Sequence, residues 1–168
     1  LRDEAATLTH AQLAQAMALA AARFARAGVR SGDVVAICAF NSVGYVVACL
    51  AAAGMGAVVA PLPQSATADS LARMIADCDA KLVLVDDDTR EVVAGDAVRA
   101  VVRDLADIAS TVPAAHETTA FDWPAIEPAQ PFNIIYTSGT TGTPKGIVQS
   151  HAMRETHVRL GEASGYRT

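Results

Sequence analysis

The sequence has 168 residues, of which 52% are apolar and 18% are charged, and its formal net charge is -5. A chain of this length buries about 70% of the surface that its unfolded form exposes, which is enough for one domain with a sizeable core. The acidic balance provides no basic surface for nucleic acid or for an anionic membrane, so we expect neither as a partner. These properties indicate a small, acidic, cytoplasmic domain.

An uncharged stretch over residues 34–68 is long enough to raise the question of a membrane span. Polar residues, glycines and prolines divide it into pieces of strand and helix length, and no cluster of lysine or arginine flanks it. These breaks lie at Asn41, Ser42, Gly54, Gly56, Pro61 and Pro63. We therefore expect a buried strand, helix and strand rather than a transmembrane segment.

Two groups of residues were considered as metal ligands, and neither predicts a metal site. The three cysteines Cys38, Cys49 and Cys78 form no CxxC pair and lie in apolar surroundings, so we expect buried, reduced thiols. The aspartates at 86–88 follow an apolar strand-like run, where one of them can cap the next segment while the others are solvated. No metal-binding residue is assigned.

The predicted elements alternate between helices and strands. The first helix begins after Thr9, which forms a capping-box pattern with Gln12, and ends near Gly28. The expected strands cover residues 33–40, 57–62, 81–86 and, near the sheet edge, 98–104, and the expected helices between them cover 42–53 and 67–78. This alternation predicts an α/β fold with a doubly wound, mostly parallel sheet and flanking helices.

The residue composition changes over about 109–131, where four prolines and scattered polar residues predict a surface connector. A strand is expected again at 132–136. A tract of glycine and hydroxyl residues follows it, then an apolar segment at 146–152 and a helix-like segment at 153–164. The tract therefore links two ordered elements.

The tract reads YTSGTTGTPKG over residues 136–146 and has the chemistry of a phosphate-binding loop. Glycines at 139, 142 and 146 let the backbone amides approach phosphate oxygens closely, and Lys145 adds a positive charge. Rotatable hydroxyl donors come from Thr137, Ser138, Thr140, Thr141 and Thr143. A flexible linker is the alternative interpretation, but a linker has no reason to end in PKG between two strand-like runs.

The spacing of this tract excludes a Walker A loop. That motif reads GxxxxGK followed by serine or threonine, whereas Lys145 follows a proline and precedes a glycine. Pro144 removes one amide donor, but its fixed backbone angle would orient Lys145 relative to the loop.

The tract resembles the phosphate-binding signature of the adenylate-forming (AMP-binding) superfamily, and the segments AGMGAVVAPLP and DAKLVLVD match the family in order and spacing. The resemblance covers about 8–151. It implies the N-terminal subdomain of an acyl-CoA synthetase-like fold, in which loop 137–146 holds the β and γ phosphates of ATP with Mg²⁺. The residues implied in this role are Thr137, Ser138, Gly139, Thr140, Thr141, Gly142, Thr143 and Lys145.

The activity that the resemblance implies is that of an acid–thiol ligase. A carboxylic acid, such as a fatty or aryl acid, attacks the α-phosphorus of ATP to give an acyl-adenylate and pyrophosphate, and the thiol of coenzyme A then takes the acyl group. An adenylation domain of a nonribosomal peptide synthetase is the alternative enzyme. A short phosphate-binding or interaction module without catalysis is the alternative outside enzymes.

The family's other motifs are absent from these 168 residues. We therefore interpret residues 1–168 as the N-terminal part of the AMP-binding domain, with the remainder of the large domain and the C-terminal domain missing. On this interpretation the piece alone is inactive. A parallel sheet without its neighbours also predicts self-association, with a homo-oligomer as one form of it, or disorder over 152–168.

Two histidines near the tract were considered for catalysis. His151 is next to Ser150, but neighbouring residues of a strand point to opposite faces, so we expect no catalytic pair. His157 lies at a spacing that does not put it on the same helix face as His151, so we expect no metal pair and assign it to the surface or to packing.

Overall fold

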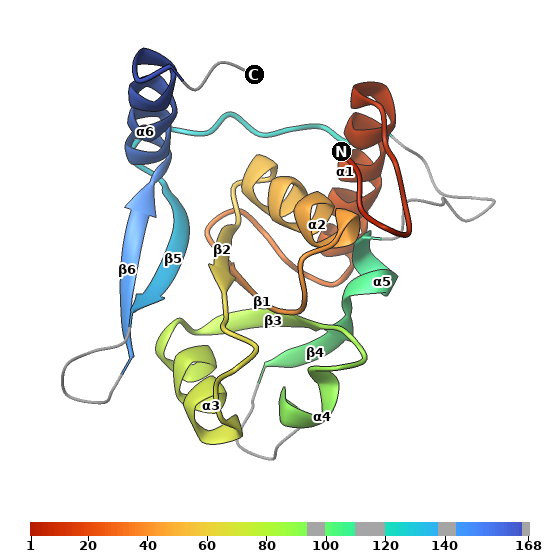
Figure 1. Ribbon diagram of the computed structural model, residues 1–168, viewed down its shortest axis with the longest axis vertical. Coiled ribbons are helices and arrows are strands. Elements are labelled where there is room, and N and C mark those ends of the chain that lie inside the picture. Colours follow the sequence, from red (N-terminus) through yellow and green to blue (C-terminus); the bar gives the residue numbers. More distant parts are fainter. Residues whose placement is uncertain (94–99, 110–119, 138–143, 166–168) are drawn as a thin grey trace.

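The computed structural model describes residues 1–93, 100–109, 120–137 and 144–165. Helices and strands alternate through most of this length (Figure 1). The elements are α1 (His10–Arg26), β1 (Val34–Cys38), α2 (Val43–Gly54), β2 (Val58–Pro61), α3 (Ala68–Asp77), β3 (Ala80–Val85), α4 (Arg90–Val93), β4 (Val101–Asp104), α5 (Leu105–Ala109), β5 (Pro131–Thr137), β6 (Lys145–Ser150) and α6 (His151–Ala163).

The strands form one sheet in the order β4-β3-β1-β2-β5-β6. Neighbouring strands are parallel except β5 and β6, which form an antiparallel hairpin. Helices α1, α2 and α5 cover one face of the sheet, and α3 and α4 cover the other (Figure 1). The predicted doubly wound, mostly parallel α/β fold is confirmed, and β4 lies at the sheet edge as expected.

The first helix has the boundaries that the sequence predicts. Thr9 Oγ1 accepts a hydrogen bond from the Gln12 amide at 3.2 Å, and Gln12 Oε1 accepts one from the Thr9 amide at 2.8 Å. This reciprocal pair is the predicted capping box. Gly28 follows the helix at φ +85°, a conformation that other residues adopt only with strain.

The core consists of two apolar layers, one on each face of the sheet. Side chains of α1 and α2 pack on one face, where Phe24 and Val47 are fully buried. Leu71 and Met74 of α3 pack on the other face against Val83 and its neighbours. Strand β1 and residues 82–85 of β3 are apolar on both sides because both layers cover them, which explains their continuous apolar sequence.

The region 109–131 differs in part from the predicted surface connector. Residues 120–130 contain no helix or strand, as expected, and 110–119 lie outside the described residues. However, Phe121 packs against the core layer of α1 and α2, and its ring meets Trp123 edge to face with centroids 4.9 Å apart. The connector therefore covers part of α2. Helix α5 directly before it was not predicted.

The helix-like segment predicted at 153–164 is confirmed as α6, so disorder, one of the two alternatives given for 152–168, is wrong over the described part of that segment. Residues 151–163 form α6, which begins where Ser150 Oγ accepts a hydrogen bond from the Met153 amide at 3.3 Å. Exposed apolar side chains are nevertheless present on β6 and α6, at Ile147, Val148, Met153, Val158 and Leu160. Self-association stays a prediction, which sedimentation velocity over a concentration series would test.

The cysteines form no disulfide: Cys38 and Cys78 are buried and Cys49 is half-buried. Burial raises the pKa of the Cys38 and Cys49 thiols to about 11, so both are protonated and unreactive at neutral pH. In the described ranges, none of the helices has the length and apolar character needed to cross a bilayer.

Candidate functional site

The carboxyl edge of the parallel strands is where α/β sheets bind ligands, above all where neighbouring strands send their connections to opposite faces. Strands β1 and β3 meet this condition. The chain leaves β1 toward α2 on one face and leaves β3 toward α4 on the other (Figure 1). The residues at this switch point are therefore the first candidates for a ligand-binding site.

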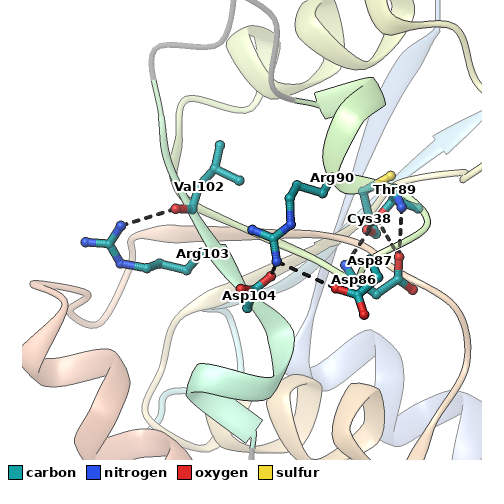
Figure 2. Close-up of polar contacts among 8 residues, drawn as sticks. All are labelled: Cys38, Asp86, Asp87, Thr89, Arg90, Val102, Arg103 and Asp104. Carbon is teal, nitrogen blue, oxygen red and sulfur yellow. Dashed lines mark hydrogen bonds and ion pairs between the residues drawn. The ribbon is translucent and has the colours of Figure 1, made fainter.

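The switch point is filled by the chain's own hydrogen bonds. Asp86 Oδ2 accepts from the Phe40 amide at 2.6 Å, which joins the segments that follow β3 and β1. Thr89, only 4% exposed, donates its hydroxyl to the Cys38 carbonyl and accepts a hydrogen bond from the Asp86 amide at 3.1 Å. Figure 2 shows Asp86 and Thr89 beside Cys38. These polar groups at the switch point therefore form hydrogen bonds with one another.

Asp86 has the capping role that the sequence predicts for one of its three aspartates. Its carboxylate also accepts from the Thr89 amide at 3.0 Å, at the entrance to α4. Partial burial raises the pKa of Asp86, but the hydrogen bonds from Phe40 and Thr89 outweigh it, so the pKa lies below its ordinary value. Asp87 and Asp88 are exposed, as expected.

Arg90 continues this polar network toward solvent. Its guanidinium forms an ion pair with Asp104 at the end of β4 and lies 3.8 Å from Asp87 (Figure 2). Within the described ranges, His, Cys, Asp and Glu side chains form no group of three that could hold a metal ion. The network therefore stabilises the ends of β3 and β4, and it supplies no evidence for a metal centre.

The β5–β6 hairpin carries the predicted phosphate-binding tract at the same edge of the sheet, because β5 runs parallel to β2. Thr137 pairs with Lys145, and Tyr136 pairs with Gly146, in the antiparallel ladder. Thr137, Lys145 and Gly146 are exposed. The structure thus brings the first and last predicted ligand residues, Thr137 and Lys145, opposite each other in the ladder.

The other predicted site residues cannot be placed. Ser138, Gly139, Thr140, Thr141, Gly142 and Thr143 lie outside the described residues. Their assignment to phosphate binding stays a prediction from the sequence.

Tyr136 is not among the predicted site residues, and the structure gives it specific partners. Its hydroxyl lies 2.9 Å from the Met74 carbonyl oxygen and 2.8 Å from Asp77 Oδ2, both in the last turn of α3. The first letter of the tract, an aromatic residue with a polar tip, was the only sequence signal for this role. Nothing in the sequence pointed to α3 as its partner.

Ser150 and His151 form no catalytic pair, as expected. Ser150 caps α6, while the Nε2 atom of His151 is shielded from solvent and has no hydrogen-bond partner in the described part of the chain. The His151 ring meets Phe132 edge to face at 5.1 Å. Loss of solvation lowers the pKa of His151, which keeps the ring neutral. His157 is exposed, as predicted.

The described residues form a doubly wound α/β sheet whose β5–β6 hairpin carries the two ends of the tract, and comparison with known proteins supplies the family. The model of the family described as "AMP-binding enzyme" matches residues 1–162. The chain belongs to this family. The resemblance drawn from the tract is therefore confirmed.

Individual relatives come from two kinds of protein. The nonribosomal peptide synthetase fmqA of Aspergillus fumigatus is 30% identical over 145 residues, which cover 86% of this chain and 4% of the relative. The 2-succinylbenzoate–CoA ligase of Geobacillus kaustophilus is 32% identical over 149 residues, which cover 89% of this chain and 29% of the relative. The chain thus spans less than a third of either protein.

A solved structure also matches most of this chain. ATP-bound MatB from Rhodopseudomonas palustris superposes with a TM-score of 0.79 and 30% sequence identity, covering 92% of this chain and 32% of that chain. The α/β sheet described above is therefore the fold of an N-terminal portion of such enzymes.

Proposed function

We propose that the chain is the phosphate-binding part of an ATP-dependent ligase that activates a carboxylic acid as an acyl-adenylate and releases pyrophosphate. The observation that carries this proposal is the pairing of Thr137 with Lys145 at the stems of the YTSGTTGTPKG tract, in a chain that belongs to the AMP-binding family. The ATP bound to the related MatB supports ATP as the nucleotide.

The proposed role of the tract is to hold the pyrophosphate that leaves as the acid attacks the α-phosphorus. Negative charge on the leaving group grows in the transition state, so donors already in place stabilise that state. Lys145 supplies a positive charge, and Thr137 supplies a hydroxyl donor at the same level of the ladder. The residues 138–143 would contribute backbone amides and further hydroxyls.

Mg²⁺ fits the proposal as the partner of the ATP phosphates, where it would share their negative charge. The described residues offer it no group of three carboxylate, histidine or cysteine side chains. We assign Mg²⁺ no residue of this chain.

The acceptor of the acyl group is proposed to be the thiol of coenzyme A. The segments at 41–45 and 61–86 resemble those of stand-alone CoA ligases, and the relative from Geobacillus kaustophilus carries CoA ligase in its name. The relative from Aspergillus fumigatus is named a nonribosomal peptide synthetase, which keeps a carrier-bound thiol as the second candidate. Both candidates share the adenylation step.

The test is pyrophosphate release by the full-length protein that contains this chain, screened with fatty, aryl and amino acids in the presence of ATP and Mg²⁺. We expect release with one class of acid, followed by thioester formation with coenzyme A. Thioester formation only on a carrier protein would favour the peptide synthetase. Absence of acid-dependent release with every acid, in a protein that still binds pyrophosphate, would favour a binding module without catalysis.

The 168 residues by themselves are expected to release no pyrophosphate. The chain spans 32% of the MatB chain, and the groups that would contact the α-phosphorus and the acid are not among the residues assigned above. Robust acid-dependent release by the purified 168-residue chain would contradict this division of roles.

A further inference from the structure

Tyr136 links the start of the proposed phosphate loop to a helix far away in the sequence. Its hydroxyl is within hydrogen-bond distance of the Met74 carbonyl oxygen at 2.9 Å and of Asp77 Oδ2 at 2.8 Å. Both acceptors belong to the last turn of α3, where the helix carbonyl groups carry partial negative charge. A hydroxyl donor is therefore well matched to this position.

The hydroxyl is protonated at neutral pH and can act as a donor. Burial raises the pKa of Tyr136, and the hydrogen bond to Asp77 and the nearby thiol of Cys78 raise it further. No titration of this group interrupts the contact with α3.

Gly146, opposite Tyr136 in the ladder, provides the space in which the tyrosine ring lies. A Cβ atom at Gly146 would be 3.3 Å from Cε1 and Cζ of Tyr136 and 3.0 Å from Cγ2 of Ile134. Aromatic residues often cover a glycine of the neighbouring strand in this way. The ring of Tyr136 thus contacts both stems of the loop.

This contact also bears on the register of the hairpin. A shift of one residue would move the side chain of Lys145 to the other face of the sheet, and a strand with a glycine specifies its register weakly. Gly146 has no side chain with which to hold the register, whereas Tyr136 is fixed to α3 and to the apolar layer around Ile134. The tyrosine can therefore fix the level at which Thr137 and Lys145 face each other.

We infer that Tyr136 is a positioning residue for Thr137 and Lys145, the stems of the proposed phosphate-binding tract: its hydroxyl holds β5 against the last turn of α3, and its ring packs on Gly146 of β6. The inference rests on the proposed function, because it assigns Tyr136 a role in phosphate binding. It adds Asp77 and Gly146 as the residues through which Tyr136 acts.

The test compares Tyr136→Phe, which keeps the ring and removes the hydroxyl, with Tyr45→Phe. Tyr45 is a half-buried tyrosine on α2, which covers the opposite face of the sheet. We expect Tyr136→Phe in the 168-residue chain to bind Mg²⁺–pyrophosphate about fivefold more weakly, as the loss of one neutral hydrogen bond implies. The amides of Lys145 and Gly146 should also exchange hydrogen faster. Tyr45→Phe should leave both quantities unchanged.

Asp77 provides a second comparison. Asp77→Asn keeps an oxygen acceptor and should retain most of the wild-type affinity for pyrophosphate, whereas Asp77→Ala should lose part of it. Added to Tyr136→Phe, Asp77→Ala should have little further effect, because the interaction is already absent.

The inference is overturned if Tyr136→Phe binds pyrophosphate as the wild type does, or if Tyr45→Phe weakens binding equally. A wild-type chain that binds no pyrophosphate contradicts the proposed function and the role in phosphate binding together. Hydrogen exchange at Lys145 and Gly146 then still decides whether Tyr136 anchors the stems.

Discussion

Thr137 and Lys145 face each other across the antiparallel ladder of β5 and β6, although residues 138–144 separate them in the sequence. The pairing puts the hydroxyl and the ammonium group at the carboxyl edge of the parallel strands. The switch point between β1 and β3, where a ligand would be expected by analogy with other doubly wound sheets, is filled instead by Asp86 and Thr89. The hairpin is therefore the better candidate site.

Substitution of Thr89 tests whether its hydrogen bonds stabilise the fold by joining the segments that follow β1 and β3. Thr89→Val keeps the shape of the side chain but leaves the Cys38 carbonyl and the Asp86 amide without their partner. We expect the free energy of unfolding to fall by about 1–3 kcal/mol, the cost of leaving buried polar groups unpaired. Urea denaturation measures this loss.

The control for Thr89 is Thr156→Val. Thr156 is exposed on α6 and donates its hydroxyl to the Ala152 carbonyl at 2.9 Å, so its loss should change stability by less than about 0.5 kcal/mol. Equal losses of stability in Thr89→Val and Thr156→Val would contradict the stabilising role of the Thr89 hydrogen bonds.

Gly54 tests the contact between α2 and the connector. A Cβ atom at Gly54 would lie 2.8 Å from Cζ3 of Trp123, so Gly54→Ala has to displace the indole. We expect a loss of about 1–3 kcal/mol from overpacking. The fluorescence of Trp123, the single tryptophan, should shift to the red as the ring becomes more exposed.

Gly161→Ala is the matched control on α6, where a Cβ atom would meet nothing within 4 Å. Because alanine favours a helix over glycine by about 1 kcal/mol, this variant should be slightly more stable than the wild type and keep its emission spectrum. An unchanged spectrum in Gly54→Ala would show that Trp123 does not cover α2.

His151 predicts a pH dependence of stability. Loss of solvation lowers its pKa in the folded state below the ordinary value of 6.5, so the unfolded chain takes up the proton first as the pH falls. The contribution to stability is therefore complete above about pH 6.5 and decreases below it, until the pKa of the folded state is also passed. Urea midpoints between pH 8 and pH 5 measure the change.

The comparison for His151 is His151→Gln, which should remove this part of the pH dependence. His157→Gln changes an exposed histidine of the same helix and controls for the loss of an ionisable group. The explanation is wrong if the wild type and His151→Gln lose stability in parallel between pH 8 and pH 5.

The sequence predicted the sheet and its helices because both signals are local. Continuous apolar runs such as that at 82–85 mark strands covered on both sides, and Thr9 with Gln12 marks a helix start. Helix α5 was missed because five residues, Leu105–Ala109, are too few to show a helical period. Helix α6 was predicted as a helix-like segment at 153–164, and the alternative of disorder there came from the expectation that the sheet lacks its neighbours.

The sequence predicted the chemistry of the candidate site but not the tertiary contacts that hold it in place. The residue types of the tract indicate phosphate binding because glycine, hydroxyl groups and one lysine suit that ligand. The contacts of Tyr136 with Met74 and Asp77, and of Trp123 with Gly54, join segments far apart in the chain. Such contacts follow from the packing of α3 and of the connector, which residue types alone do not specify.

The most direct test of the proposed site is the affinity of the 168-residue chain for Mg²⁺–pyrophosphate, measured by calorimetry for the wild type, Lys145→Ala and Lys81→Ala. Lys81 is the other lysine of the chain and is exposed on β3. We expect Lys145→Ala to bind at least about tenfold more weakly, because it loses a charge-assisted hydrogen bond, and Lys81→Ala to bind as the wild type does. Equal affinities of Lys145→Ala and the wild type would contradict phosphate binding at the β5–β6 hairpin.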